Sequence, residues 1–305
     1  MATQYLVGTG GWAYFMVAGD RLAQYSRCFN FVEVNVTHYM HPPLILARGW
    51  RRRVQNNFAF SVKCHRNVSH KYLLNPSVKS LEDFNRSLAI CHALHAEILV
   101  VQTPPSLGLS AALIRSFIKS VDLGGVRLAL EPRGSIAQDA LRAMERHEVI
   151  HVVDLSRDMP AYVGDILYTR LLGLGDHNIY QFDDYELRDI RVRVESTGVE
   201  KAFLSFHGLK MYVDAGRMKE YIETGVPPPV TNGVGLDSLR YVVAEDAVFP
   251  ATRDELFSAV GWKLVEMPGG VRVRAITILS SIEDRLYKDL DDLMNSVRIA
   301  WPESH

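Results

Sequence analysis

Apolar segments alternate with amphipathic segments up to about residue 210, and this rhythm restricts the fold more than any other feature of the chain. Strands are predicted at 5–8, 31–36, 58–64, 97–102, 127–132, 149–154, 166–172 and 201–207. Helices are predicted at 43–54, 79–95, 110–119, 136–146 and 184–196. Ile98–Val101 and Val149–Val153 are continuously apolar, as is typical of parallel strands covered on both faces. Pro160 and Gly164 leave room between two of these strands for only a short helix or a loop.

Eight such units in about 225 residues match the size of a (β/α)₈ barrel. An open doubly wound sheet would favour a complete G-x-G-x-x-G turn after its first strand, and Gly8–Trp12 does not supply one. The predicted fold class is therefore α/β, a (β/α)₈ TIM barrel with a small C-terminal α+β appendage.

The alternation of strands and helices stops near Val226-Pro-Pro-Pro229, and this Pro-rich segment indicates a stiff connector. The predicted domains are a barrel over 1–225, a connector over 226–249 and a small acidic C-terminal domain over 250–305. Thr252 begins a capping-box pattern, and Pro268-Gly-Gly270 indicates a hairpin. This last piece has little core of its own by sequence, so it is expected to pack on the barrel or on a partner protein.

Composition excludes several classes of protein. The 34 basic and 35 acidic side chains nearly cancel, which argues against a protein that simply coats nucleic acid. No apolar run approaches the roughly 18 residues that span a bilayer, and the N-terminus lacks the pattern of a signal peptide. Three cysteines without paired CxxC spacing indicate a reducing compartment. We expect a soluble, cytoplasmic protein without a membrane partner.

Polar side chains recur on one parity near the ends of the predicted strands. Alternate residues of a strand face the same side, so these side chains converge inside the barrel mouth if the sheet closes. The candidates are Glu33, Asn35, Lys63, Gln102, Glu131, Arg133, Asp154, Arg170 and His207. A single such residue is more often a solvated or structural one, but burying so many charges for stability alone is costly. The recurrence favours a functional site.

The balance of charge in this set favours a site without a metal or other cofactor. Three carboxylates face three cationic side chains, whereas a divalent cation site usually has excess carboxylate or histidine. Arg133, Arg170 and Lys63 are predicted to bind anionic groups, and Glu131 to act as general acid or base with Glu33 as its partner. The alternative makes Glu33, Glu131, Asp154 and His207 the ligands of a metal.

Two further features carry weaker signals. Trp12 follows the first predicted strand and is predicted either to line the site or to pack in the rim. The run Arg48-Gly-Trp-Arg-Arg-Arg53 is most often a solvated helix face, and its alternative is contact with nucleic-acid phosphates. His38, His41 and His151 are each expected to be ordinary hydrogen-bonded histidines rather than ligands.

Six segments occur together in a recognisable order. They are Gly8-Thr-Gly-Gly-Trp-Ala-Tyr14, Phe31-Val-Glu-Val-Asn-Val-Thr-His-Tyr39, Phe58-Ala-Phe-Ser-Val-Lys63, Gln102-Thr-Pro-Pro105, Leu130-Glu-Pro-Arg133 and Tyr168-Thr-Arg-Leu-Leu-Gly173. As a set they resemble the YecE-like family, a widespread domain of unknown function with a TIM-barrel fold, over about residues 5–222. The resemblance implies Glu33, Asn35, Lys63, Gln102, Glu131, Arg133 and Arg170 as the matched site positions.

The chain departs from the family pattern at two places. Leu172 stands where the family usually has histidine, and Ser205-Phe206 stands where it tends to have an Asn-Asn pair. The ligand set is therefore expected to differ from that of typical members.

The sequence predicts a TIM-barrel enzyme, a hydrolase or lyase that acts on a small anionic or sugar-like substrate in the barrel mouth. One alternative is a metal-dependent phosphodiesterase or nuclease. The other is a non-catalytic protein that binds a ligand or nucleic acid and recruits a partner protein through its C-terminal domain.

Overall fold

The computed structural model describes residues 3–301. Its contacts divide the chain into two compact units. The barrel unit consists of the residues up to Leu172 together with Asp189–His207, and the C-terminal unit consists of Gly173–Arg188 together with the chain from Gly208 onward. Each unit is described by itself.

Eight parallel strands form the sheet of the barrel unit, in the order β6-β5-β4-β3-β2-β1-β8-β7. They are β1 (Gln4–Thr9), β2 (Phe31–Val34), β3 (Ala59–Lys63), β4 (Ile98–Gln102), β5 (Arg127–Glu131), β6 (Ile150–His151), β7 (Ile166–Leu171) and β8 (Lys201–Phe206). A parallel bridge between Val153 and Thr169 joins the two outer strands. The backbone N–H of Arg170 also donates to the Val153 carbonyl at 3.2 Å, so the sheet closes into a barrel. The predicted fold is confirmed.

The barrel interior below the polar residues is filled by large apolar side chains. Phe31, Tyr168 and Phe203 pack ring against ring, with centroids 5.1–6.0 Å apart, and all three are buried. Ile98 and Val100 of β4 belong to the same cluster. This layer makes the barrel a packed core rather than a pore, as is usual for the fold.

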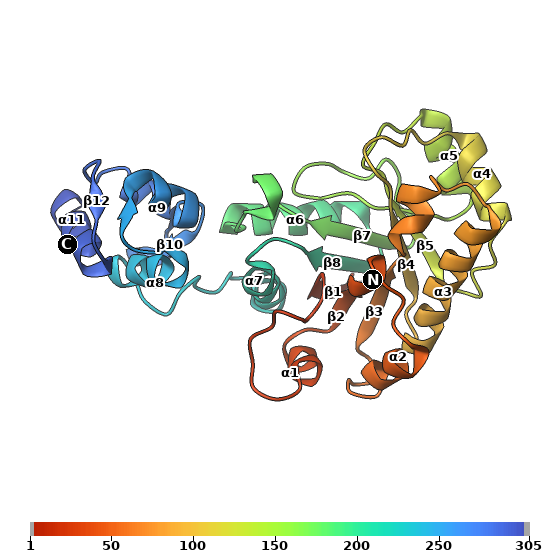
Figure 1. Cartoon of the computed structure of the whole chain (residues 1–305), viewed down its shortest axis with the longest axis horizontal. Coiled ribbons are helices and arrows are strands. Elements are labelled where there is room, and N and C mark those ends of the chain that lie inside the picture. Colours follow the sequence, from red (N-terminus) through yellow and green to blue (C-terminus); the bar gives the residue numbers. More distant parts are fainter. Residues whose placement is uncertain (1–2, 302–305) are drawn as a thin grey trace. The chain divides into compact units, whose positions relative to one another are not determined.

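Helices follow the first five strands in the order expected of strand–helix units. They are α1 (Arg21–Cys28), α2 (Leu44–Arg51), α3 (Val78–Leu94), α4 (Ala111–Lys119) and α5 (Gln138–Arg146). Figure 1 shows α2 to α5 along the outside of the strands. Ser77 caps α3 through a hydrogen bond from the Ser80 N–H, and Asp20 caps α1 in the same way. α6 (Asp184–Thr197) precedes β8, and its residues are divided between the two units.

The segment between β6 and β7 contains no helix among the described residues, in line with the prediction from Pro160 and Gly164. β6 is shorter than the predicted strand 149–154, because only Ile150 and His151 pair with β5. Beyond them Val153 bridges to β7, and the Asp154 carboxylate accepts hydrogen bonds from the backbone N–H groups of Ser156 and of Leu172, which directly follows β7.

The C-terminal unit contains α7 (Met211–Thr224), α8 (Leu236–Asp246), α9 (Arg253–Val260), α10 (Ala275–Leu279) and α11 (Leu290–Ala300). Two small antiparallel sheets pair β10 (Leu264–Glu266) with β11 (Arg272–Arg274) and β12 (Leu286–Tyr287) with β9 (Ala251–Thr252). The capping box at Thr252 and the hairpin around Pro268–Gly270 are both present, as the sequence predicts.

The expectation that the C-terminal piece has little core was wrong. Leu239, Leu256, Ile278 and Leu293 are all within 1% of full burial and belong to one apolar cluster. The helix α8, which contributes Leu239, lies in the stretch expected to be a connector. The Pro-rich segment ends before α8 begins, so the first part of 226–249 lacks helix and the rest contributes apolar side chains to the core.

Among residues 3–301, every helix is too short or too polar to cross a lipid bilayer.

Candidate functional site

Five charged or titratable side chains from five different strands meet at one end of the barrel. Lys63 and Glu131 are the last residues of β3 and β5, Glu33 and Arg170 lie near the ends of β2 and β7, and His207 directly follows β8. Their side chains are exposed by only 0–6%. Because parallel strands of a closed barrel end on the same face, the sequence parity does bring these five together.

Arg170 lies at the centre of this group. Its Nε donates to Glu33 Oε2 at 3.1 Å, and its Nη1 donates to Glu131 Oε2 at 2.5 Å. The other oxygen of Glu131 lies 2.6 Å from Nη2 of Arg133. Arg170 Nη2 faces Nδ1 of His207 at 3.3 Å. We call Glu33, Glu131, Arg133, Arg170 and His207 the mouth network.

The contacts of His207 fix its tautomer. Arginine can only donate hydrogen bonds, so Nδ1 of His207 is the acceptor and the ring proton lies on Nε2. That nitrogen is 2.9 Å from the Ser205 hydroxyl and 3.6 Å from Glu33 Oε2. Burial, with the charge of Arg170, lowers the pKa of His207, so the ring is neutral at neutral pH.

Two buried hydroxyls hold Glu33 from below. The Tyr168 hydroxyl donates to Glu33 Oε2 at 2.8 Å and lies 2.7 Å from the Ser61 hydroxyl. The sequence analysis did not single out Tyr168, although its position two residues before Arg170 on the same strand was the signal. Burial, with the charge of Glu33, raises the pKa of Tyr168 well above its usual value, so it remains a donor.

Both carboxylates of the mouth network are ionised at neutral pH. Burial alone would raise the pKa of Glu33 and of Glu131, but Arg170 and the other groups around each carboxylate together lower it below its usual value. His207 and Lys63 further lower the pKa of Glu33, and Arg133 and Lys63 that of Glu131. Neither carboxyl group can therefore donate a proton near pH 7 in this arrangement.

Lys63 is the cation that this network leaves unpaired. Among residues 3–301 its ammonium makes no ion pair within 4.0 Å, although its side chain is 6% exposed. Burial, together with Arg170, lowers the pKa of Lys63 to about 7, and Glu33 and Glu131 oppose that shift only in part. A buried amine near its own pKa exchanges protons readily at neutral pH.

Two buried side-chain oxygens also lack a hydrogen-bond partner within the described part of the chain. One lies on β2 and the other on the residue that follows β2. They are Oε1 of Glu33 and Oδ1 of Asn35, two residues apart. The amide nitrogen of Asn35 donates to the Gly10 carbonyl at 3.2 Å. Glu33 pairs in register with Ser61 of β3, and Lys63 lies two residues beyond Ser61. Unpaired acceptors and an unpaired donor thus lie at the ends of neighbouring strands, and leaving buried acceptors unpaired costs free energy unless a polar molecule satisfies them.

Four other predicted site residues lie at the rim of the barrel mouth or outside it. Gln102 ends β4 as the register partner of Glu131 and is half-buried. The Arg133 side chain is 33% exposed, which makes it the accessible edge of the network. Trp12 packs edge-on against Trp50, with ring centroids 5.2 Å apart. Asp154 has both oxygens engaged, by the N–H of Leu172 and by Ser156.

The side chains predicted as metal ligands in the barrel mouth do not bring their ligand atoms together in one cluster. Arg170 lies between Glu33 and Glu131, and the Asp154 carboxylate is occupied by hydrogen bonds from Ser156 and from the N–H of Leu172. Within residues 3–301, the only group of three or more candidate ligand side chains whose ligand atoms lie within 4.8 Å of one another is elsewhere. The geometry therefore gives no support to the alternative ligand set.

The arginine run of the sequence is partly committed to the fold. Arg51 donates to the carbonyls of Phe58 and Gln55 and lies 5.2 Å from the Phe60 ring. Arg53 pairs with Asp20 at 3.6 Å. The run is thus not a free row of phosphate-binding groups.

Gly10 permits the close approach of His207. A Cβ atom on Gly10 would lie 2.3 Å from Nδ1 of His207 and 2.9 Å from the Asn35 amide nitrogen. We expect Gly10→Ala to displace the His207 ring from Arg170 and to lower the free energy of unfolding by about 1–3 kcal/mol. Denaturant unfolding and the His207 ring signals in NMR spectra measure both effects.

Gly49 provides the control for this substitution. It lies in α2, and a Cβ atom there would meet nothing within 4 Å. Gly49→Ala should be neutral or stabilising by about 0.4–1 kcal/mol. Equal stability losses in the two variants would contradict the role given to Gly10.

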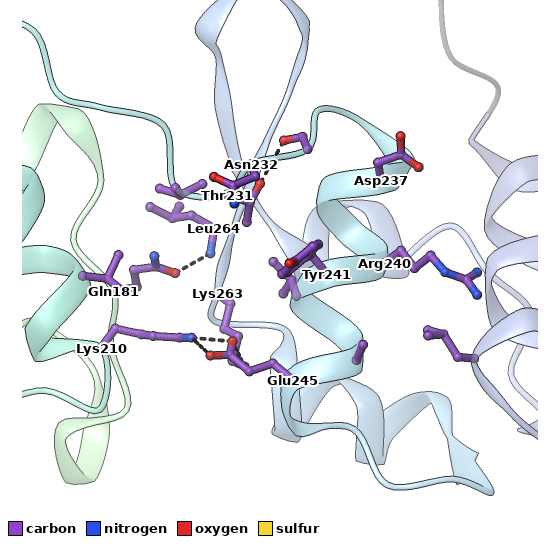
Figure 2. Close-up of a pocket in the computed structure, with 16 residues that line it drawn as sticks. Gln181, Lys210, Thr231, Asn232, Asp237, Arg240, Tyr241, Glu245, Lys263 and Leu264 are labelled. Atoms are coloured by element: carbon purple, nitrogen blue, oxygen red, sulfur yellow. Dashed lines mark hydrogen bonds and ion pairs between the residues drawn. The ribbon is translucent and has the colours of Figure 1, made fainter. Parts of the chain in front are cut away.

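A second polar cluster lines a cavity of about 890 Å³ in the C-terminal unit. Figure 2 shows Lys210 and Lys263 both directed toward Glu245, and Gln181 directed toward the backbone of Leu264. Lys263 Nζ lies 2.8 Å from Glu245 Oε2. Tyr241, which is 64% exposed, adds an aromatic wall.

Solved structures similar to this chain include two DUF72 family proteins and a sugar epimerase. A DUF72 family protein from Enterococcus faecalis is 15% identical, with 73% of this chain and 98% of that one covered and a TM-score of 0.57. A DUF72 family protein from Thermotoga maritima is 19% identical, with 72% and 99% covered and a TM-score of 0.56. A D-psicose 3-epimerase structure, determined in the presence of D-fructose, is 10% identical over 71% of this chain and 98% of that one, with a TM-score of 0.47. No curated protein matches the sequence.

The family model described as "Protein of unknown function DUF72" matches residues 6–229. YecE-like is another name for this family, so the resemblance seen in the sequence is confirmed. The match begins within β1, continues past β8 and includes every residue of the mouth network. The chain belongs to the DUF72 family.

Proposed function

We propose that the barrel is an enzyme, a lyase or hydrolase, that acts on a small anionic or sugar-like substrate at the mouth network. One observation carries the proposal: Lys63 makes no ion pair, and the buried oxygens Oε1 of Glu33 and Oδ1 of Asn35 have no hydrogen-bond partner, among the described residues, although these residues lie at the ends of the neighbouring strands β3 and β2. A hydroxyl-bearing molecule both donates and accepts hydrogen bonds, so it would satisfy all three groups.

Arg133 is the group proposed to bind the anionic part of the substrate. It is the most exposed member of the mouth network and has a planar guanidinium that pairs with carboxylate or phosphate. An anion bound there would compete with Glu131 for Arg133. Glu131 would then lose one of its two cationic partners, which raises its pKa and its strength as a base.

Lys63 is proposed as the principal acid–base group. An amine that is about half protonated at neutral pH can take a proton from the substrate and return it in a later step. Negative charge that develops on the substrate would be stabilised by Arg170, which stays charged because Glu131 and Glu33 raise its pKa further. Glu33 would hold a substrate hydroxyl in place.

The test is a panel of small hydroxy acids, sugar acids and sugar phosphates incubated with the full chain in deuterium oxide. NMR spectroscopy would follow cleavage or exchange of carbon-bound hydrogen. We expect at least one compound to react with the wild type and not with Lys63→Met. Equal reaction with both proteins would show that Lys63 is not the acid–base group.

The lowered pKa of Lys63 also predicts how stability depends on pH. An unfolded lysine titrates near 10.4, so between about pH 7 and 10.4 the unfolded chain binds more protons at this position than the folded chain. The free energy of unfolding should therefore rise with pH across that window. Urea unfolding of wild type and Lys63→Met over this range isolates the effect, because tyrosines and cysteines titrate equally in both. Parallel curves for the two proteins would rule the shift out.

A non-catalytic role has one observation in its favour. The cavity of the C-terminal unit combines an aromatic wall with a cluster of cations and carboxylates, as a ligand or peptide site does. In that case the protein would be a sensor that recruits a partner through residues 250–300. Removal of these residues would then abolish partner binding and leave ligand binding at the barrel intact.

A further inference from the structure

Three side chains from three segments meet beside the barrel mouth, outside the mouth network. His41 follows β2, His65 follows β3, and Asp83 lies in the second turn of α3. One ring nitrogen of each histidine and one oxygen of Asp83 all lie within 4.8 Å of one another. Nε2 of His41 is 3.1 Å from Oδ1 of Asp83, and the two imidazole rings stack with centroids 4.4 Å apart.

These separations suit a tetrahedral ion. Zinc binds histidine nitrogen and carboxylate oxygen at about 2.0–2.2 Å, so two ligand atoms of one tetrahedral zinc lie about 3.3 Å apart. The His41–Asp83 separation is close to that value before any metal binds. Two histidines and one carboxylate are also the donor set of zinc sites that leave a fourth position open.

The groups around the cluster hold the ligands in place. The amide of Asn67 donates to Oδ2 of Asp83 at 2.9 Å, which leaves Oδ1 toward the histidines. Nδ1 of His41 is buried and has no partner within the described residues. The backbone N–H of His65 is directed to the Ser87 hydroxyl of α3 at 3.2 Å, which fixes that loop against the helix. The hydrogen bond from Asn67 to Asp83 is of the kind that orients a metal ligand.

The electrostatics favour free lone pairs on His41 and Asp83. Burial lowers the pKa of His41, so its ring is neutral near pH 7. Burial would raise the pKa of Asp83, but its hydrogen bonds from Asn67 and His41 lower it, so the group is a carboxylate. Arg86, the nearby cation that acts on His41, is exposed to solvent and is therefore screened.

We infer that His41, His65 and Asp83 form a binding site for a divalent transition-metal ion of the zinc class, with at least one coordination position open. The ion would tie the loops after β2 and β3 to α3. Those loops also carry Thr37, whose hydroxyl donates to the Lys63 carbonyl at 2.6 Å, and His38, whose Nδ1 lies 3.0 Å from the Cys64 carbonyl. The site is separate from the acid–base chemistry proposed above.

The experiment uses the full chain, purified without a polyhistidine tag and stripped with a chelator. Zinc chloride is titrated in the presence of a competing chelator, and bound metal is counted by elemental analysis after desalting. One equivalent is expected, and Co²⁺ in its place should give the visible absorption of a four-coordinate ion. His41→Ala and Asp83→Asn should each weaken binding on the order of 100-fold or more, since losing even a supporting group costs about 10–100-fold.

His147→Ala is the matched control, because His147 is exposed and lies outside the cluster. It should bind metal as the wild type does. Circular dichroism identifies a variant that fails to fold, and His65→Gln then takes its place. The inference is overturned if the wild type binds no stoichiometric metal, or if folded cluster variants bind as tightly as the control. Metal content is the readout, so failure of the proposed enzyme activity would leave this result unaffected.

Discussion

Replacing Arg170 with methionine is expected to lower the free energy of unfolding by about 3–5 kcal/mol at neutral pH, the usual cost of removing one partner from a buried ion pair. Arg170 is 4% exposed and is hydrogen-bonded to both Glu33 and Glu131. Without it, two buried carboxylates remain close together with Lys63 as the nearest compensating charge. Urea unfolding followed by circular dichroism measures the loss.

The sign of the pH dependence makes this prediction sharper. In the wild type both carboxyl groups have lowered pKa values, so their stabilising effect is present above the unfolded value of about 4.3 and is lost as pH falls through the folded values. In Arg170→Met burial remains and raises those pKa values instead. Acidification then neutralises the buried charges, and the stability gap between variant and wild type should narrow from about pH 8 to about pH 5.

Arg157→Met is the control for Arg170→Met. Arg157 is 47% exposed and lies 3.8 Å from Asp154, so its replacement should cost about 1 kcal/mol or less at any pH. A loss in Arg170→Met no larger than in Arg157→Met would mean that the mouth network contributes little to stability.

Replacing Lys63 with methionine is expected to reduce turnover by about 10²–10⁴-fold, the usual contribution of a general acid–base group. The same change should leave the free energy of unfolding at neutral pH unchanged or higher. Methionine keeps most of the apolar stem of lysine and removes a buried amine that has no ion-pair partner among residues 3–301. Rates are measured on whichever compound the panel identifies, and stability by urea unfolding.

Lys201→Met is the matched control for Lys63→Met. Lys201 begins β8, at the opposite end of the barrel strands, and pairs with Glu97 at 2.9 Å. Its loss should leave turnover unchanged. If Lys63→Met instead keeps its activity and loses several kcal/mol of stability, Lys63 is a structural cation and not a reactive one.

The clustering of the barrel residues was predictable because it follows from periodicity. Glu33, Lys63, Glu131 and Arg170 each lie on the inward parity of an apolar strand, and parallel strands end together. The alternation of side chains along a strand fails as a guide in one case. Alternation along the third strand would also place His65 on the face of Lys63, but β3 ends at Lys63, and the backbone N–H of His65 donates to the Ser87 hydroxyl of α3.

Which partner each charged group has could not be predicted from spacing. Strand parity predicted Glu131 as the acid or base and Lys63 as an anion-binding group, but both roles depend on pKa values. The fold surrounds Glu131 with two guanidinium groups and leaves Lys63 without an ion pair among the described residues. The role of principal acid–base group, predicted for Glu131, is therefore proposed for Lys63 instead.

Apolar periodicity and strand parity in the sequence by themselves determined a closed α/β barrel and the set of polar residues at its mouth. Both are properties of position along the chain, and they depend only on backbone geometry. The tertiary structure alone decided that Arg170 lies between the two glutamates, that His41 and His65 meet Asp83, and that α8 supplies core to the C-terminal unit. These outcomes depend on distances of a few ångströms between residues far apart in sequence, because charge interactions and coordination weaken steeply over such distances.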